Sequence, residues 1–515
     1  MSASLSGAVY AIVGFSAPFG LAPRIAPPLF LARCLAVWLF TALILFFLDD
    51  PLAVLALSGL VLLVLAPSDS LQRLGFFFIA VPCLPAYLQV YLPFPGINWL
   101  IMLTYYKVVV FFVLVPILFR SSPQGNHRGD FSVADASVVI YIILTVALVT
   151  VSMGPTAGPR FLIDQLLVLG IPYFVLSRTI RSQEDFDFCF RAILFVSLIL
   201  ASIAIIATLK QWDFYRLKEP PSVFSIPDIR SGLIRIAVTA NTHSLGYHLA
   251  LGFLFLEYLK GALTLGTLRL WLFRGMLLAG LVSTDSRGAM LALAVAIFVY
   301  VVIMVRKAFI RWGLLLSLAT AIIAGGLWLI TTEDASGVDA YNSVGYRQLL
   351  LQISIQHILE NPVFGDLHFL LDPKFGVLLQ GQGIIDITNF YLQVALCFGL
   401  VGLALFGAIF APTLLGLTRT IARSAAARSD DRDRIRKISA LLLSATAGWF
   451  VLVVTTSDVA LTLHLGLILI AMSRAMLRLE ASQPVAKVKR DDRTPSLRGF
   501  AYRVIRPEGS AGGTG

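Results

Sequence analysis

The sequence has few charged residues, few histidines and few cysteines. Only 13% of its 515 residues are Asp, Glu, Lys or Arg, and it contains 6 histidines and 4 cysteines. Soluble domains carry about 25% charged residues, so this composition excludes a soluble globular protein of this length. The four cysteines lie within or beside apolar runs. They therefore exclude a disulfide framework and a paired-cysteine metal site.

The chain is instead rich in apolar sequence, with 58% hydrophobic residues and a mean hydropathy of +0.86. Apolar runs of about 20 residues recur from end to end, long enough to cross roughly 30 Å of hydrocarbon as helices. In lipid only helices and closed barrels satisfy their backbone groups, and these runs are too long and too uniformly apolar for barrel strands. The sequence predicts an all-α polytopic membrane bundle of about 12–14 transmembrane helices, with spans that include 74–92, 99–119, 133–152, 232–259, 270–284 and 312–331.

The formal charge of +11 raises the possibility of a nucleic-acid partner. Most of the 40 Lys and Arg residues, however, fall in every second segment between apolar runs. This is the positive-inside asymmetry of membrane proteins, and it predicts that the N and C termini are both cytoplasmic. The basic residues are therefore expected to face the membrane surface, and we expect no nucleic-acid partner.

Four regions follow from the apolar pattern and the charges. We predict an N-terminal transmembrane bundle over 1–331, an outer loop over 332–386, C-terminal transmembrane helices over 387–478, and a disordered, basic cytoplasmic tail over 479–515. The outer loop is the longest of the chain, and a loop this long is usually functional. Its stretch "YRQLLLQISIQHILENP" predicts an amphipathic helix on the outer leaflet that ends at Asn-Pro.

Two arginines are expected at the outer membrane face. Arg287 opens a helix in "STDSRGAMLALA", and Arg347 begins the helix of the outer loop. Guanidinium groups grip phosphate oxygens through paired hydrogen bonds, so two of them would suit a pyrophosphate. The alternative is that Arg287 reaches the lipid headgroups or pairs with Asp285.

Polar residues inside apolar runs indicate a cavity. Arg235 and His243 lie on the polar side of "RIAVTANTHSLGYHLALGF", a segment that normally faces a cavity or the bundle interior. His248 in the same segment is more simply explained as a hydrogen-bonded core residue. Lys107 in "LTYYKVVVFF" is expected to line a cavity or to pair with a carboxylate.

Three motifs together resemble a known family. "STDSRGAMLALA", "GYRQLLLQISIQHILENPVFGD" and "DITNFYLQVALCFGLVGLALF" follow one another within about residues 230–410. In order and spacing they resemble the O-antigen ligase and Wzy-type polysaccharide polymerase superfamily. The resemblance implies a glycosyltransferase of the bacterial inner membrane that needs no metal or cofactor, with the 332–386 loop in the periplasm.

The resemblance also implies substrates, partners and residue roles. The donor would be an undecaprenyl-pyrophosphate-linked glycan and the acceptor another glycan, within membrane lipids. A chain-length regulator and a flippase of the same pathway would be candidate partners. Arg287 and Arg347 would grip the pyrophosphate, Asn361, Pro362 and Gly365 would shape the loop turn, and Asn389 would open the next helix.

One position departs from the family pattern. Where the ligases have the histidine taken to activate the acceptor hydroxyl, this chain has Thr388, which cannot act as a base near neutral pH. Asp386 and His357 are the candidate catalytic residues, with His368 as a further outer-loop histidine. Asp386 would equally suit a helix N-cap. The missing histidine favours a polymerase of exopolysaccharide, capsule or O-antigen over a lipid A core ligase, and a lipid-linked sugar flippase is the alternative from another class.

Overall fold

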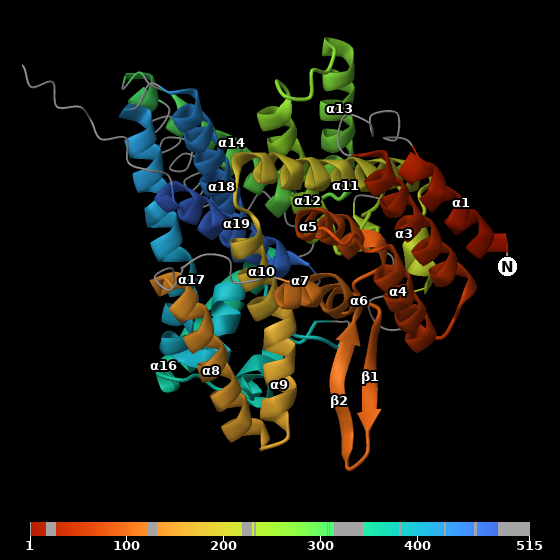
Figure 1. The fold of residues 1–515 in the computed structure, drawn as a ribbon. Helices are drawn as coiled ribbons and strands as arrows, with labels where there is room; N and C mark the ends of the chain where they lie inside the picture. Colours follow the sequence, from red (N-terminus) through yellow and green to blue (C-terminus); the bar gives the residue numbers. More distant parts are fainter. Residues whose placement is uncertain are drawn as a thin grey trace, which may run out of the picture.

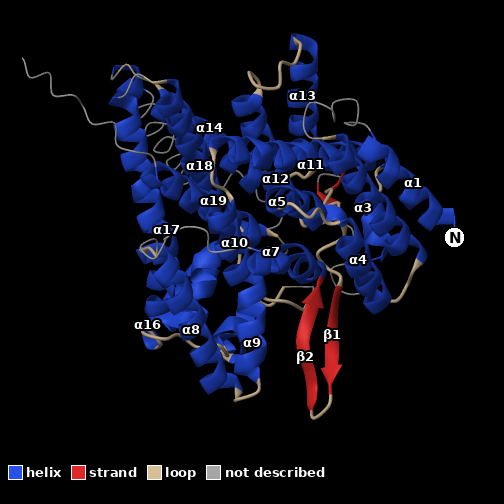
Figure 2. Ribbon diagram, viewed as in Figure 1, coloured by secondary structure: helices blue, strands red, loops and turns tan. Residues whose placement is uncertain are grey.

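The protein is a bundle of helices, as a computed structural model shows (Figure 1). It describes residues 2–16, 27–120, 131–218, 229–230, 233–305, 307, 309–313, 343–380, 383–426, 429–457 and 461–482, and every structural statement below concerns these residues. Helices account for most of them (Figure 2). The prediction of an all-α polytopic bundle is confirmed.

The first half of the chain contains these helices: α1 (Ser2–Ser16), α3 (Pro28–Phe47), α4 (Pro51–Leu65), α5 (Ser70–Ala80), α6 (Tyr105–Val109), α7 (Val115–Arg120), α8 (Val133–Met153), α9 (Ala157–Gln165), α10 (Ile171–Thr179) and α11 (Gln183–Lys210). The second half contains α12 (Thr242–Leu259), α13 (Thr267–Ser283), α14 (Arg287–Met304), α16 (Ser343–Glu360), α17 (Phe390–Ala426), α18 (Asp430–Val454) and α19 (Thr462–Ser482). The helix predicted within the outer loop is present as α16.

Eight helices among the described residues are long and apolar enough to cross a membrane. Two shorter apolar helices, Pro51–Leu65 and Ser70–Cys83, join them in the bundle. Most of the span expected near 312–331 lies outside the described residues, as does the tail from 483. The helices α12 and α13, which stand where two more spans were predicted, are not among the eight. A further difference comes from one unpredicted element between α5 and α6.

That element is an antiparallel hairpin of β1 (Gln89–Phe94) and β2 (Ile97–Thr104). Membrane-spanning helices are predicted over 74–92 and 99–119. The prediction is wrong for the end of the first span and the start of the second, which form the two strands. Prolines at 82, 85, 93 and 95 cannot continue a helix. Pro95 and Gly96, whose φ is +84°, instead form the tight turn of the hairpin.

The helix α17 is broken at Gly399, and the outer-loop turn fills the break. Gly399 has a φ of +66°, which frees backbone groups on either side of it. The Leu400 N–H donates to the Pro362 carbonyl at 2.8 Å, and the Asp366 N–H donates to the Leu396 carbonyl at 2.7 Å. The Asn-Pro-x-x-Gly turn therefore hydrogen-bonds the backbone groups that the break in α17 frees, and it fixes the outer loop to that helix.

Gly399→Ala is expected to destabilise this junction. A Cβ at 399 would lie 2.2 Å from the Val363 carbonyl oxygen, and the positive φ alone costs a side chain about 1–2 kcal/mol. We expect a lower unfolding temperature in detergent and faster proteolysis of the outer loop. Gly407→Ala is the control because a Cβ there meets no atom within 4 Å. Equal unfolding temperatures for Gly399→Ala and Gly407→Ala would contradict a stabilising contact between the outer-loop turn and the break in α17.

Ion pairs join the helix ends that were predicted to be cytoplasmic. Arg434, near the start of α18, pairs with Glu184 at 2.7 Å and with Asp187 at 2.8 Å, both near the start of α11. At the same end of α18, Arg436 donates to the Ile303 carbonyl of α14 at 3.0 Å. Asp187 thus has an arginine partner, whereas Asp185 accepts backbone N–H groups at the start of α11. We propose that this end of the bundle faces the cytoplasm.

Cysteine labelling tests this orientation. In a version lacking the four native cysteines, Leu371→Cys should react with an impermeant thiol reagent in intact cells, because Leu371 is 78% exposed in the outer loop. Ala422→Cys, which is exposed near the opposite end of α17, should react only after lysis. Labelling of Ala422→Cys alone in intact cells would reverse the orientation.

Candidate functional site

Several helix ends meet at one end of the bundle. The Ser244 and Thr462 hydroxyls, at the starts of α12 and α19, are 2.7 Å apart. A Cβ on Gly288, at the start of α14, would lie 2.5 Å from the Thr455 hydroxyl oxygen, just after α18. Ser457, two residues further on, hydrogen-bonds the carboxylate of Asp386, which precedes α17. The N-termini of α12, α14, α17 and α19 therefore gather around the 455–457 segment, and helix N-termini favour anions.

Arg287 stands at the first position of α14. The Ser286 side chain caps this helix by accepting the Ala289 N–H at 3.3 Å. Arg287 itself is exposed, and it makes no hydrogen bond or ion pair with another residue that the structure describes. The alternative of an ion pair with Asp285 is therefore not seen among the described residues, and Arg235 donates to the backbone carbonyl of Asp285. The Arg287 guanidinium is available to a ligand.

Arg235 and His243 tie the segment before α12 to the start of α14. Arg235 donates to the Thr242 hydroxyl at 3.0 Å and to the Asp285 carbonyl at 3.4 Å. The His243 Nδ1 lies 2.8 Å from the Ser286 hydroxyl oxygen. Both predicted residues thus lie beside Arg287. The contacts of Arg235 and His243 hold in place the segment that carries Arg287.

Asp386 and Arg347 lie near each other, and Ser457 contacts Asp386. The Tyr346 hydroxyl donates to the Asp386 carbonyl at 2.9 Å and accepts the Asp386 N–H at 3.1 Å, which fixes the backbone there. Burial raises the pKa of Asp386, while the Ser457 hydroxyl and the Arg347 guanidinium oppose the rise. Its carboxyl is therefore a stronger proton acceptor than an exposed aspartate.

The cap of α17 is Asn389 and not Asp386. The Asn389 side-chain oxygen accepts the N–H groups of Tyr391 at 3.0 Å and Leu392 at 3.3 Å. This contact occupies the amide oxygen of a residue that was predicted to bind substrate. It also leaves the Asp386 carboxylate without a capping task, which favours the catalytic interpretation of Asp386 over the capping one.

Lys107 combines the two alternatives considered from the sequence. Its side chain is 4% exposed, forms an ion pair with Asp164 and donates to the Met102 carbonyl at 2.7 Å. The pair also lines a cavity of about 510 Å³. Gln393 of α17 and His464 of α19 contribute to the same wall, close to the starts of their helices.

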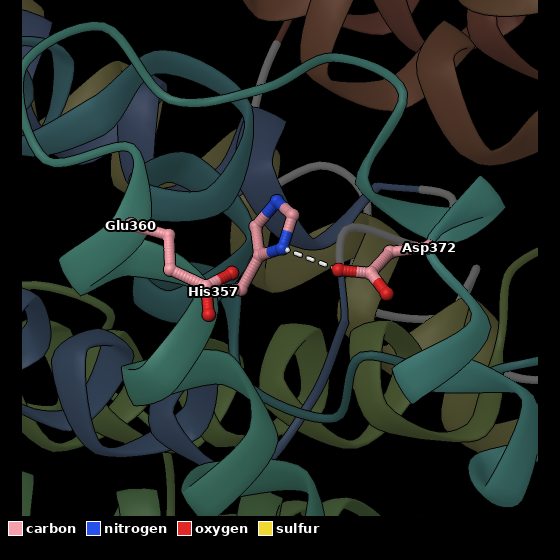
Figure 3. A group of neighbouring side chains, drawn as sticks. All are labelled: His357, Glu360 and Asp372. Carbon is pink, nitrogen blue, oxygen red and sulfur yellow. Dashed lines mark hydrogen bonds and ion pairs between the residues drawn. The ribbon is translucent and has the colours of Figure 1, made fainter.

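His357 lies in a separate cluster within the outer loop (Figure 3). Its Nδ1 is 3.1 Å from Asp372, and its Nε2 is 3.6 Å from Asp366. It is ten residues after Arg347 on α16, about 15 Å along the helix axis. This geometry favours His357 as a structural residue of the loop, away from Asp386. His368, for its part, contacts the Ser152 hydroxyl through Nδ1 at 3.2 Å.

The His357 cluster also has the residue types of a metal site. Donor atoms of His357, Glu360 and Asp372 lie within 4.8 Å of one another. The Lys374 ammonium, however, donates to both carboxylate oxygens of Glu360, at 2.5 and 2.7 Å. Asp372 also accepts the Lys374 N–H at 2.9 Å, which helps hold its pKa low. The Lys374 ammonium thus pairs with one carboxylate of the cluster, and these contacts join α16 to the 372–374 segment of the loop.

Sequence reasoning missed two residues at the site. Tyr346 positions Asp386 through both of its backbone groups, and Ser457 bonds the Asp386 carboxylate. Tyr346 directly precedes Arg347, so its place at the start of the loop helix could have been noticed. Ser457 lies far along the chain from the other residues, and only the folded structure brings it to the site.

Taken together, the fold and the site define a multi-pass membrane protein with helix N-termini and arginines gathered at one end, suited to a polyanionic ligand. Residues 273–407 match the family model described as O-antigen ligase, Wzy_C. This match confirms the predicted resemblance: this part of the chain is O-antigen ligase-like. Arg287, Arg347 and Asp386 lie within it, whereas Arg235, His243 and Lys107 lie outside. A search of curated proteins found no match to the chain.

Proposed function

We propose that this protein polymerises cell-surface polysaccharide by joining undecaprenyl-pyrophosphate-linked oligosaccharides at the periplasmic face of the bacterial inner membrane. The match to the O-antigen ligase family supports a ligase or polymerase type of membrane enzyme. The observation that carries the proposal is that two exposed arginines and a half-buried carboxylate lie around the 455–457 segment.

Each residue then has a task in the transfer. Arg287 and Arg347 hold the pyrophosphate of the donor, together with the N-termini of α14 and α17. Asp386 accepts the proton of an acceptor hydroxyl, whose oxygen attacks the anomeric carbon of the donor sugar. The bond from that carbon to the pyrophosphate breaks, and undecaprenyl pyrophosphate leaves with the electron pair. Positioning and charge stabilisation by fixed groups supply most of the rate enhancement.

The flippase alternative gains no support from the broken helix. Transporters often contain interrupted helices whose freed backbone groups line the substrate site. In α17 the groups at the break, including those of Leu400 and Leu396, are bonded to the outer-loop turn. The break therefore anchors the loop and does not open a passage.

A deletion strain distinguishes polymerase from ligase. Loss of a polymerase should leave surface glycan that is capped by a single repeating unit. Loss of a ligase should instead let long glycan accumulate on undecaprenyl pyrophosphate, with none on lipid A core. We expect the first pattern, restored by the parent gene and not by a gene encoding Arg347→Ala. The second pattern would replace the polymerase by the ligase.

A further inference from the structure

The hairpin β1–β2 presents aromatic rings and no charge. Residues 89–104 contain no Asp, Glu, Lys or Arg. Tyr91 is 54% exposed and Phe94 is 51% exposed. The Trp99 ring packs edge-on against Tyr91 with 5.2 Å between centroids, and the Arg160 guanidinium lies 4.5 Å from the Trp99 ring centroid. An exposed group of aromatic side chains of this kind is typical of a binding surface.

The hairpin is built for water and not for hydrocarbon. Its sheet has only two strands, so each strand leaves one edge without a strand partner among the described residues. Unpaired backbone edges are not tolerated facing lipid, because nothing there can bond them. The hairpin extends beside α9 toward the end of the molecule opposite α13 (Figure 1), and Arg160 near the start of α9 contacts Trp99. We therefore place its aromatic residues beyond the membrane surface.

The strand edge is a poor template for a partner protein. Pro93 lies within β1 and is exposed, and it has no N–H to offer to an added strand. A register shift between Leu92 and Phe94 further disturbs this edge. Prolines and bulges on edge strands oppose pairing with another chain. The ligand should therefore be recognised by the rings of the hairpin and not by its backbone.

The base of the hairpin leads to the cavity beside the candidate site. Met102 and Thr104, near the end of β2, line the cavity together with Lys107 and Asp164. Gln393 lines the same cavity and lies four residues after Asn389, the cap of α17. The aromatic side chains of the hairpin are thus followed, at its base, by the charged and amide groups that line the cavity. Such groups bond hydroxyls, and aromatic rings stack against the apolar faces of sugar rings.

We propose that the hairpin is a glycan-binding arm, with Tyr91, Phe94 and Trp99 as stacking platforms that guide a polysaccharide chain to the Lys107–Asp164 edge of the cavity. This inference rests on the proposed function, because it supplies the substrate class of the same site. The arm holds sugar residues remote from the reacting bond. Its loss should therefore weaken glycan binding and shorten the product.

The test compares two aromatic sites on the full-length protein in detergent. The double variant Tyr91→Ala/Trp99→Ala removes two platforms. Trp271→Ala is the matched control: Trp271 is 63% exposed on α13, with the Arg274 guanidinium 4.7 Å from its ring centroid. The probe is the oligosaccharide released by mild acid from the lipid-linked pool of the producing cells, and binding is measured by calorimetry. We expect the double variant to bind at least tenfold more weakly, and Trp271→Ala to bind like the parent.

Further variants separate folding and catalysis from binding. Trp99→Phe keeps a ring and should retain most of the binding, which shows that the hairpin has folded. Arg347→Ala should lose transfer and still bind the released oligosaccharide. The double variant could bind oligosaccharide more weakly while no protein, the parent included, shows transfer. This result would reject the proposed function and still support the glycan-binding arm.

Three results would overturn the arm. The first is unchanged oligosaccharide binding by the double variant. The second is failure of the parent to bind the oligosaccharide at all. The third concerns tryptophan fluorescence. If brominated phospholipid quenches a part of the parent's fluorescence that Trp99→Phe lacks, the hairpin lies in the membrane.

Discussion

Asp386→Asn is expected to lower the rate of glycan transfer by roughly 10² to 10⁴ while the protein stays folded and binds the lipid-linked donor. The amide has the size of the carboxyl group but cannot take a proton. Because Asn389 already caps α17, the substitution removes no cap and should leave the unfolding temperature near that of the parent. Initial rates with purified protein and saturating donor measure the effect.

The pH dependence of the parent gives a second view of the same residue. Burial raises the pKa of Asp386, and a general base works only when deprotonated. The rate should therefore rise with pH through this raised pKa and fall in acid, at a higher pH than for an exposed aspartate. The residual rate of Asp386→Asn should lack that acidic limb. Transfer at close to the parent rate would exclude Asp386 as the base and direct attention to His243, beside Ser286.

Replacing either site arginine by alanine should lower transfer at least tenfold, and replacing both by about 100-fold or more, since each removes a charge-assisted hydrogen bond worth more than a neutral one. Arg287 and Arg347 are both exposed, so little stability should be lost. Lysine should rescue poorly at either position because it lacks the planar two-pronged fit to phosphate.

The control for the arginines is Arg423→Ala. The Arg423 side chain is 70% exposed at the other end of α17, 3.8 Å from Glu480. It should leave transfer unchanged, because it lies on the predicted cytoplasmic side. Equal losses for Arg423→Ala and Arg347→Ala would show that surface charge in general, and not a pyrophosphate site, is being measured.

The helices were predictable because hydrophobic runs carry a strong and local signal. The span that became α8 and the amphipathic helix that became α16 both follow from residue spacing alone. The hairpin was missed because its apolar residues satisfy a hydropathy window just as a helix would. Only the prolines around it and the Pro-Gly turn argued otherwise.

The candidate site was only partly predictable, because it depends on contacts between distant segments. Arg287 could be identified from its place at the mouth of an apolar run. Its connection to Asp386 runs from Gly288 to Thr455 and Ser457, which lie more than a hundred residues further along the chain. The break at Gly399 likewise depends on backbone bonds to Pro362 that no periodicity reveals. His357 illustrates the reverse: its residue type suggested catalysis, and its aspartate partners indicate a structural role.

The most direct measurement is the release of undecaprenyl pyrophosphate by the purified protein in proteoliposomes supplied with lipid-linked oligosaccharide. The proposed function predicts one undecaprenyl pyrophosphate released for each glycan bond formed, with a ladder of longer lipid-linked products. It also predicts that both signals are lost together in Arg287→Ala/Arg347→Ala. Oligosaccharide that crosses the bilayer with no pyrophosphate released and no bond formed would contradict the account.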